Sequence, residues 1–243
     1  MLKNDDTLLN ELLSDENLKI AKQRVKKNKG ASGIDGMEVK ELDEYLSKHL
    51  DEIKEQIRNK KYSPKPVKRV EIPKPDGGVR NLGVPTVVDR FVQQAIAQVL
   101  TPIYEPKFSE SSYGFRPNRC CEMAIQKALE FMNDGYQWVV DIDLEKFFDN
   151  VNHGKLLKQM WTMGIRDKSL ICIIGKILKS EIEGIGRPDK GTPQGGIISP
   201  LLSNIVLNEL DWWLSDQWET KSTRYPYTHS HKYEALKKSN LKE

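Results

Sequence analysis

The sequence has little cysteine, little histidine and no long hydrophobic run. Its 243 residues include three cysteines and four histidines, and the odd number and spacing of the thiols fit neither a disulfide framework nor a zinc site. No apolar run approaches the roughly 20 residues of a membrane-spanning helix, so we expect no membrane partner. The first residues, MLKNDDTLLNELLSDENL, are acidic and polar and lack a signal-peptide layout. These absences favour reduced thiols and a cytoplasmic protein.

Familiar catalytic signatures are missing as well. The sequence contains neither a Ser-His-Asp signature nor a phosphate-binding P-loop. Hydrophobic residues make up 38% and charged residues 30% of the chain, a composition typical of globular proteins rather than disordered ones. The length is enough for one large domain or two small ones with a buried core.

Positive charge is concentrated in two segments, although the net charge is only +3. The segment 58–80 holds eight basic and two acidic residues, and a second basic cluster is 22-KQRVKKNKG-30. Such a local excess is the footprint expected for a polyanion. A solvated basic face explains the charge equally well.

The hydrophobic pattern predicts an α+β fold. Residues 67–72 and 79–84 read as strands of a hairpin around 75-PDGG-78. Apolar stripes and capping residues predict helices elsewhere. These helices are expected at 14–29, 39–57, 86–104 and 121–132, and from Asn152, from Asp167 and from Ser199, the last with Ser199 as N-cap and Pro200 at its first position.

The segment 139-VVDIDLEKFFDNV-151 reads as a strand that carries two acids. Side chains alternate along a strand, so Asp141 and Asp143 would point to the same side. Carboxylates at a strand end can hold Mg²⁺, and a backbone carbonyl can add a further ligand. Aspartates in buried strands also serve as structural hydrogen-bond acceptors, which is the alternative interpretation.

Two neighbouring segments could supply a phosphate-binding clamp. Lys74 and Arg80 lie in the basic hairpin and could hold phosphates. The turn 193-PQGG-196 leads into a helix whose first N–H groups could face another part of the ligand. A carboxylate-bound metal opposite a basic clamp suits phosphoryl or nucleotidyl transfer.

Four ordered blocks resemble those of group II intron-encoded reverse transcriptases. They cover most of residues 71–211, and 22-KQRVKKNKGASGIDG-36 resembles the extension that precedes the fingers of these enzymes. The blocks are 71-EIPKPDGGVRNLGVPTVVDRFVQQAI-96, 101-TPIYEPKFSESSYGFRPNRCCEMAI-125, 138-WVVDIDLEKFFDNVNH-153 and 191-GTPQGGIISPLLSNIVLNELD-211.

The resemblance implies a right-hand polymerase with helix-rich fingers, an antiparallel hairpin and a partial palm sheet. It implies attack of a primer 3′-hydroxyl on the α-phosphate of a deoxynucleotide (dNTP), assisted by two Mg²⁺ ions. The implied parts are an RNA-binding extension (1–36), fingers (37–85), palm (86–152), fingers again (153–194) and palm again (195–243).

The motifs also imply site residues. Asp143 matches the catalytic aspartate, the Leu144 carbonyl would join it at the metal, and Asp141 becomes an acidic neighbour. Phe148 falls where the family excludes a ribose 2′-hydroxyl, with core packing as the alternative. The residues that match nucleotide-binding positions are Lys74, Arg80 and Gln194.

Further residues are candidates for nucleic-acid contacts. Arg116 would support the nucleotide or template pocket, or else hold its own loop as a structural arginine. Contacts to an RNA backbone are expected from basic side chains in the two clusters. These are Lys22, Arg24, Lys26, Lys27, Lys65, Lys68 and Arg69.

One departure from the family pattern is the missing Tyr/Phe-x-Asp-Asp hairpin. The only Asp-Asp pair is Asp5-Asp6, outside the motif order, and Glu243 lies about where the hairpin would follow. We therefore expect a fragment of fingers and partial palm that is inactive alone. Its exposed core surface would also allow a homodimer.

Three functions follow as alternatives. The first is an RNA-directed DNA polymerase that uses an RNA template and a DNA primer, binds its intron RNA and assists splicing as a maturase. The second is an RNA-binding maturase without polymerase activity. The third is a reverse transcriptase of a retron or a CRISPR-linked system.

Overall fold

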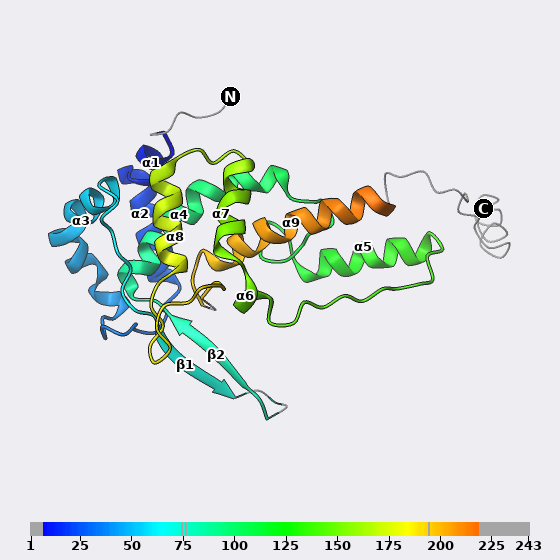
Figure 1. The fold of residues 1–243 in the computed structure, drawn as a ribbon, viewed down its shortest axis with the longest axis horizontal. Helices are drawn as coiled ribbons and strands as arrows, with labels where there is room; N and C mark the ends of the chain where they lie inside the picture. The colour runs from blue at the N-terminus through cyan, green and yellow to red at the C-terminus, as the bar shows by residue number, and fades with distance from the viewer. Residues whose placement is uncertain (1–6, 74, 76, 194, 219–243) are drawn as a thin grey trace. The chain divides into compact units, whose positions relative to one another are not determined.

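The computed structural model of the chain describes residues 7–73, 75, 77–193 and 195–218 (Figure 1). The chain divides into two compact units, Met1–Lys107 with Lys146–Val206 (the first unit) and Phe108–Glu145 with Leu207–Glu243 (the second unit). Described helices and strands are α1 (Thr7–Leu12), α2 (Asp15–Lys27), η1 (Val39–Glu41), α3 (Leu42–Arg58), β1 (Lys68–Pro73), β2 (Val79–Val84), α4 (Val87–Tyr104), η2 (Glu105–Lys107), α5 (Cys121–Asn133), α6 (Phe147–Asn150), α7 (His153–Thr162), α8 (Lys168–Leu178) and α9 (Ser199–Trp218).

Helix α4 is the central element of the first unit. Most of its residues are buried, and α1 and α2 pack against it, while α1, α3 and α7 contact α8. The N-caps predicted at Ser14, Thr86 and Asn152 are confirmed, because their side chains accept hydrogen bonds from the first turn. Asp167, from which a helix was expected, caps α8 in the same way. Helix α9 begins at Ser199 itself, one residue earlier than expected.

The cap of α8 also joins two distant elements. The Asp167 carboxylate is buried and accepts hydrogen bonds from the amides of Ser169 and Leu170, at 2.9 and 3.0 Å. Its second oxygen accepts from the amide of Leu9 in α1 at 3.0 Å. One side chain therefore caps α8 and holds α1 against it.

We expect Asp167→Ala to lower the free energy of unfolding by about 2–4 kcal/mol, because a helix cap is lost and the buried Leu9 N–H loses its acceptor. Urea unfolding measures this change. Ser14→Ala is the control, because the Ser14 side chain accepts a hydrogen bond from the Asn17 amide of its own helix. This variant should cost only about 1 kcal/mol. Equal losses would contradict the link between α1 and α8.

A second buried carboxylate lies at the start of α4. Asp89 accepts hydrogen bonds from the Tyr62 hydroxyl and the Thr86 hydroxyl, each at 2.6 Å, and from the Lys65 amide at 3.2 Å. Burial raises the pKa of Asp89, an effect that these hydrogen bonds and the Lys65 charge oppose only in part.

The raised pKa of Asp89 predicts a pH-dependent stability. The folded state favours the protonated acid, so this contribution is fully present below the pKa of the unfolded chain and is lost as pH rises through the folded pKa. From about pH 4 upward, the wild type should lose stability relative to Asp89→Asn, which does not titrate. Urea unfolding at a series of pH values tests this, and parallel curves for the two proteins would contradict it.

The glycine-rich connector 30–36 lies against the start of α4. A Cβ on Gly33 would come within 2.6 Å of the Thr86 Cα, so only glycine allows this approach. Arg90 covers the same loop and donates a hydrogen bond to the Ala31 carbonyl at 2.6 Å. The basic segment before the connector is thereby held beside α4.

The predicted hairpin is confirmed. Strands β1 and β2 pair antiparallel, from Lys68 opposite Val84 to Pro73 opposite Val79. Val67, just before β1, bridges to Ile182, which attaches the base of the hairpin to the loop after α8 (Figure 1).

The strand predicted for 139–151 does not form, because residues 139–144 have no regular secondary structure and Phe147–Asn150 form α6. A partial palm sheet is absent from the described residues, which contain one two-stranded sheet. Trp138, Val139 and Val140 are 95%, 84% and 82% exposed. An extended segment becomes a strand only when a neighbour takes up its backbone hydrogen bonds, and the described chain supplies no neighbour here. The same described part has no helix long and apolar enough to cross a membrane.

Candidate functional site

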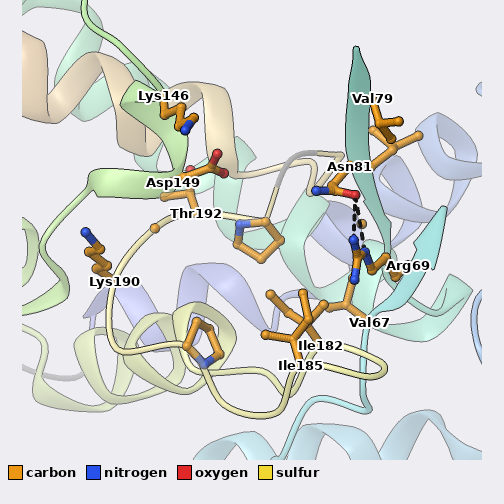
Figure 2. Close-up of a pocket in the computed structure, with 15 residues that line it drawn as sticks. Val67, Arg69, Val79, Asn81, Lys146, Asp149, Ile182, Ile185, Lys190 and Thr192 are labelled. Atoms are coloured by element: carbon orange, nitrogen blue, oxygen red, sulfur yellow. Dashed lines mark hydrogen bonds between the residues drawn. The ribbon is translucent and has the colours of Figure 1, made fainter. Parts of the chain in front are cut away.

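A pocket of about 620 Å³ opens in the first unit (Figure 2). Its walls come from the hairpin, from the residues around α6, and from the chain between 182 and 193. The lining residues are Val67, Arg69, Val79, Asn81, Leu82, Gly83, Lys146, Asp149, Ile182, Ile185, Pro188, Lys190, Gly191, Thr192 and Pro193. Three sequence blocks that lie far apart along the chain therefore meet at one cavity.

The turn at 191–196 (the Gly-rich turn) lies against α6 on one side. The amide of Gly191 donates to the Val151 carbonyl and the amide of Thr192 to the Phe148 carbonyl, each at 2.7 Å. Gly191 has φ +93°, and a Cβ there would lie 3.0 Å from the Asp149 carbonyl oxygen. Glycine is thus required both by the backbone angle and by the close approach.

The other end of the Gly-rich turn lies against the hairpin. Gly195 has φ +109°, and a Cβ there would lie 2.4 Å from the Gly83 carbonyl oxygen. The Ser199 hydroxyl, at the start of α9, donates to the Pro193 carbonyl at 2.8 Å. The described residues of the turn are thus held between α6, β2 and α9.

The pocket has a basic rim and an apolar wall. The described lining residues include three cations, Arg69, Lys146 and Lys190, and one carboxylate, Asp149. Arg69 donates to Asn81, which Figure 2 shows as dashed lines, and also pairs with Glu71 outside the lining. A cavity with excess positive charge and aliphatic walls suits a phosphate-bearing ligand with a planar base.

Two of the predicted nucleotide-binding residues, Lys74 and Gln194, lie outside the described residues. Arg80 is in β2, where its backbone pairs with Ile72. Phe148 is in α6, half-buried, with its ring centroid 5.8 Å from that of Phe147. The hairpin and α6 therefore bring the Arg80 and Phe148 segments to the same pocket, while their predicted roles stay predictions.

The predicted metal residues Asp143 and Leu144, together with Asp141, lie in the second unit. All three are exposed in a segment without regular secondary structure. Their oxygens are of the type that Mg²⁺ prefers, but within the described ranges no group of three or more His, Cys, Asp or Glu side chains gathers as a metal site. Asp143 and Leu144 therefore offer the oxygen ligands that Mg²⁺ prefers, but the described residues gather too few of them to complete a site.

Arg116 is buried in the second unit, inside its own loop. Its Nη1 donates to the carbonyls of Ser109 and Ser112, at 2.6 and 2.8 Å, and its guanidinium lies 5.4 Å from the Phe108 ring centroid. This geometry favours the structural interpretation of Arg116, although ligand contacts by the loop remain a prediction.

Several cations predicted to contact RNA take part in ion pairs. Lys22 and Lys26 both pair with Asp43, Lys65 with Asp35, and Arg69 with Glu71. Arg24 and Lys27 are exposed and Lys68 is half-buried. Exposed ion pairs are weak, so these cations can exchange carboxylates for phosphates.

Sequence reasoning missed several residues of the site. His153 is buried, and its Nε2 lies 2.7 Å from the Gly191 carbonyl oxygen, a contact that no local pattern indicates. Asn81, Lys146 and Lys190 also line the pocket. Asn81 and Lys146 lie inside recognised blocks, but the motifs imply no role for any of the three. The one sequence feature that pointed to this part of the site was the three glycines in 191-GTPQGG-196. They predicted a turn, but not that it packs against α6 and β2.

Comparison with protein families and solved structures gives consistent matches. A family profile described as "Reverse transcriptase (RNA-dependent DNA polymerase)" matches residues 72–227. A solved structure described as "Partial Cas6-RT-Cas1--Cas2 complex" is similar with a TM-score of 0.58 and 26% identity, over 86% of this chain and 35% of that chain.

The matches to curated relatives cover most of this chain, but the chain spans only about a quarter to a half of the length of those relatives. "Protein YkfC" of Escherichia coli is 37% identical over 206 residues, which is 81% of this chain and 54% of the relative. "Group II intron-encoded protein LtrA" of Lactococcus lactis is 37% identical over 79% of this chain and 32% of its own length. "Putative COX1/OXI3 intron 1 protein" of Saccharomyces cerevisiae is 34% identical over 88% and 26%.

Proposed function

This chain belongs to the reverse transcriptase (RNA-dependent DNA polymerase) family, and from that membership we propose that it forms part of an RNA-directed DNA polymerase encoded by a group II intron. Relatives that are themselves intron-encoded support the intron assignment. The observation that carries the proposal is the pocket, because the hairpin, α6 and the Gly-rich turn come from three separate polymerase blocks and meet there.

The residues of the first unit would bind and select the incoming nucleotide. Lys74 and Arg80 of the hairpin are proposed to bind its phosphates, as charge-assisted hydrogen bonds allow. Phe148 is proposed to pack under the sugar and to exclude a 2′-hydroxyl by its bulk. Gln194, following Pro193 in the Gly-rich turn, is proposed to line the same nucleotide.

Asp143 is proposed as one catalytic carboxylate of the polymerase, with the Leu144 carbonyl beside it. When Mg²⁺ is bound, it stabilises charge on the attacking and leaving oxygens. The remaining metal ligands would come from residues outside the described part of the chain. We propose that those residues also form the neighbouring strand with which 139–144 pairs. Because the sequence holds no aromatic-x-Asp-Asp motif, we propose that these 243 residues do not polymerise alone.

The proposed nucleic-acid partners are an RNA template with a DNA primer, and the intron RNA. Basic side chains of α2 and of the segment before β1 would contact the phosphate backbone, so binding should weaken as salt rises. A splicing role and a cytoplasmic location belong to the same proposal. A maturase that has lost polymerase activity is the competing function.

Primer extension on an RNA template tests the proposal. The full-length protein that contains this chain should extend a DNA primer with deoxynucleotides, and the isolated 243 residues should not. Intron RNA binding without any extension by the full-length protein would favour the competing maturase. Extension by the isolated chain would overturn the proposed need for ligands from elsewhere.

A further inference from the structure

His153 has a buried side chain that contacts the backbone of the Gly-rich turn. It is the first residue of α7 and is 4% exposed. Its Nε2 lies 2.7 Å from the Gly191 carbonyl oxygen, which can only accept, so Nε2 carries the hydrogen. Nδ1 is buried without a hydrogen-bond partner among the described residues. We propose that His153 is a positioning residue that orients the Gly-rich turn for nucleotide selection.

Helix capping does not explain the imidazole. The N-cap of α7 is Asn152, whose side chain accepts from the Lys155 amide. Packing alone explains it poorly too, because a buried nitrogen without a partner disfavours folding. Among the described residues, the His153 side chain makes its hydrogen bond to the Gly191 carbonyl, so its specific effect falls on the turn.

That hydrogen bond fixes one peptide plane together with Phe148. The peptide between Gly191 and Thr192 presents its carbonyl to His153 and its N–H to the Phe148 carbonyl, the latter at 2.7 Å. Both groups belong to one rigid plane, so a rotation that releases one bond also releases the other. His153 therefore restrains the backbone at Phe148 through the Gly191–Thr192 peptide.

The consequence rests on the proposed function, in which Phe148 selects the sugar and Gln194 lines the nucleotide. Loss of the imidazole would free the Gly191–Thr192 peptide to rotate and would loosen Phe148 relative to Pro193. The chemical step itself involves neither His153 nor this peptide. Nucleotide affinity and sugar selection should therefore change more than the maximal rate.

Steady-state extension by the full-length protein tests this with three variants. His153→Ala should raise the KM for deoxynucleotides and weaken discrimination against ribonucleotides by about tenfold each, with kcat within about threefold. His153→Gln places an amide N–H near the position of Nε2 and should recover most of both values. Leu156→Ala, one turn along α7 and fully buried, should lower thermal stability without changing discrimination.

Hydrogen exchange separates failure of this inference from failure of the proposed function. In His153→Ala the Thr192 amide should exchange about tenfold faster than in the wild type, beyond any change shared by the core amides. Unchanged exchange overturns the positioning role, whatever the protein catalyses. Unchanged KM and discrimination in an active enzyme overturn the selection role alone, whereas a wild type that extends no primer overturns the proposed function and the selection role with it.

Discussion

Replacing Gly195 by alanine is expected to lower the free energy of unfolding by about 4 kcal/mol, the largest stability effect that we predict for a single methyl group in this protein. Two costs add. The backbone at φ +109° is one that side chains rarely adopt, and the new Cβ would lie 2.4 Å from the Gly83 carbonyl oxygen. Because the neighbour is backbone, the turn and β2 must move apart. Urea unfolding gives the loss from the midpoint at constant slope.

Gly186→Ala is the matched control for Gly195→Ala. Gly186 also has a positive φ, +93°, but a Cβ there would meet nothing within 4 Å. This variant carries only the backbone cost, about 1–2 kcal/mol. If both variants lose the same stability, the contact between the Gly-rich turn and β2 does not contribute. In the full-length protein, Gly195→Ala should also weaken nucleotide binding, since it displaces a wall of the pocket.

Local signals predicted the helices and the hairpin well. Thr86 and Asp167 cap helices within three residues of themselves, so their effect can be seen in the sequence. The strands on either side of the predicted turn at 75–78 are likewise neighbours in the chain, and they pair as expected. The second bond of Asp167, to Leu9, was not predictable, because 158 residues separate the partners.

Neither the absence of the strand predicted in 139–151 nor the contacts within the site could be predicted from local sequence, because both depend on parts of the chain that are far apart in sequence. Alternation of Val140, Ile142 and Leu144 is compatible with a strand, but pairing decides whether one forms, and the described chain offers this segment no partner. At the site, the motif predicted a role for Phe148 but not the residues that position its backbone. The hydrogen bond from His153 to Gly191 spans 38 residues and became visible only in the structure.

Replacing Asp143 by alanine should lower primer extension by the full-length protein by about a thousandfold or more, because a carboxylate that stabilises transition-state charge through a metal contributes several kcal/mol. The same variant should leave intron RNA binding unchanged, since the substitution removes a negative charge far along the sequence from the basic clusters. Single-turnover extension and filter binding measure the two activities separately.

Asp141→Ala is the control that separates a catalytic carboxylate from a merely acidic segment. Both aspartates are exposed, lie two residues apart and belong to the same irregular segment, so neither substitution should change stability in this chain by more than about 0.5 kcal/mol. A loss confined to Asp143→Ala can then be read as lost chemistry rather than lost folding. Equal losses for both variants would make the acids a shared electrostatic feature, and unchanged extension in Asp143→Ala would show that the catalytic carboxylate lies elsewhere.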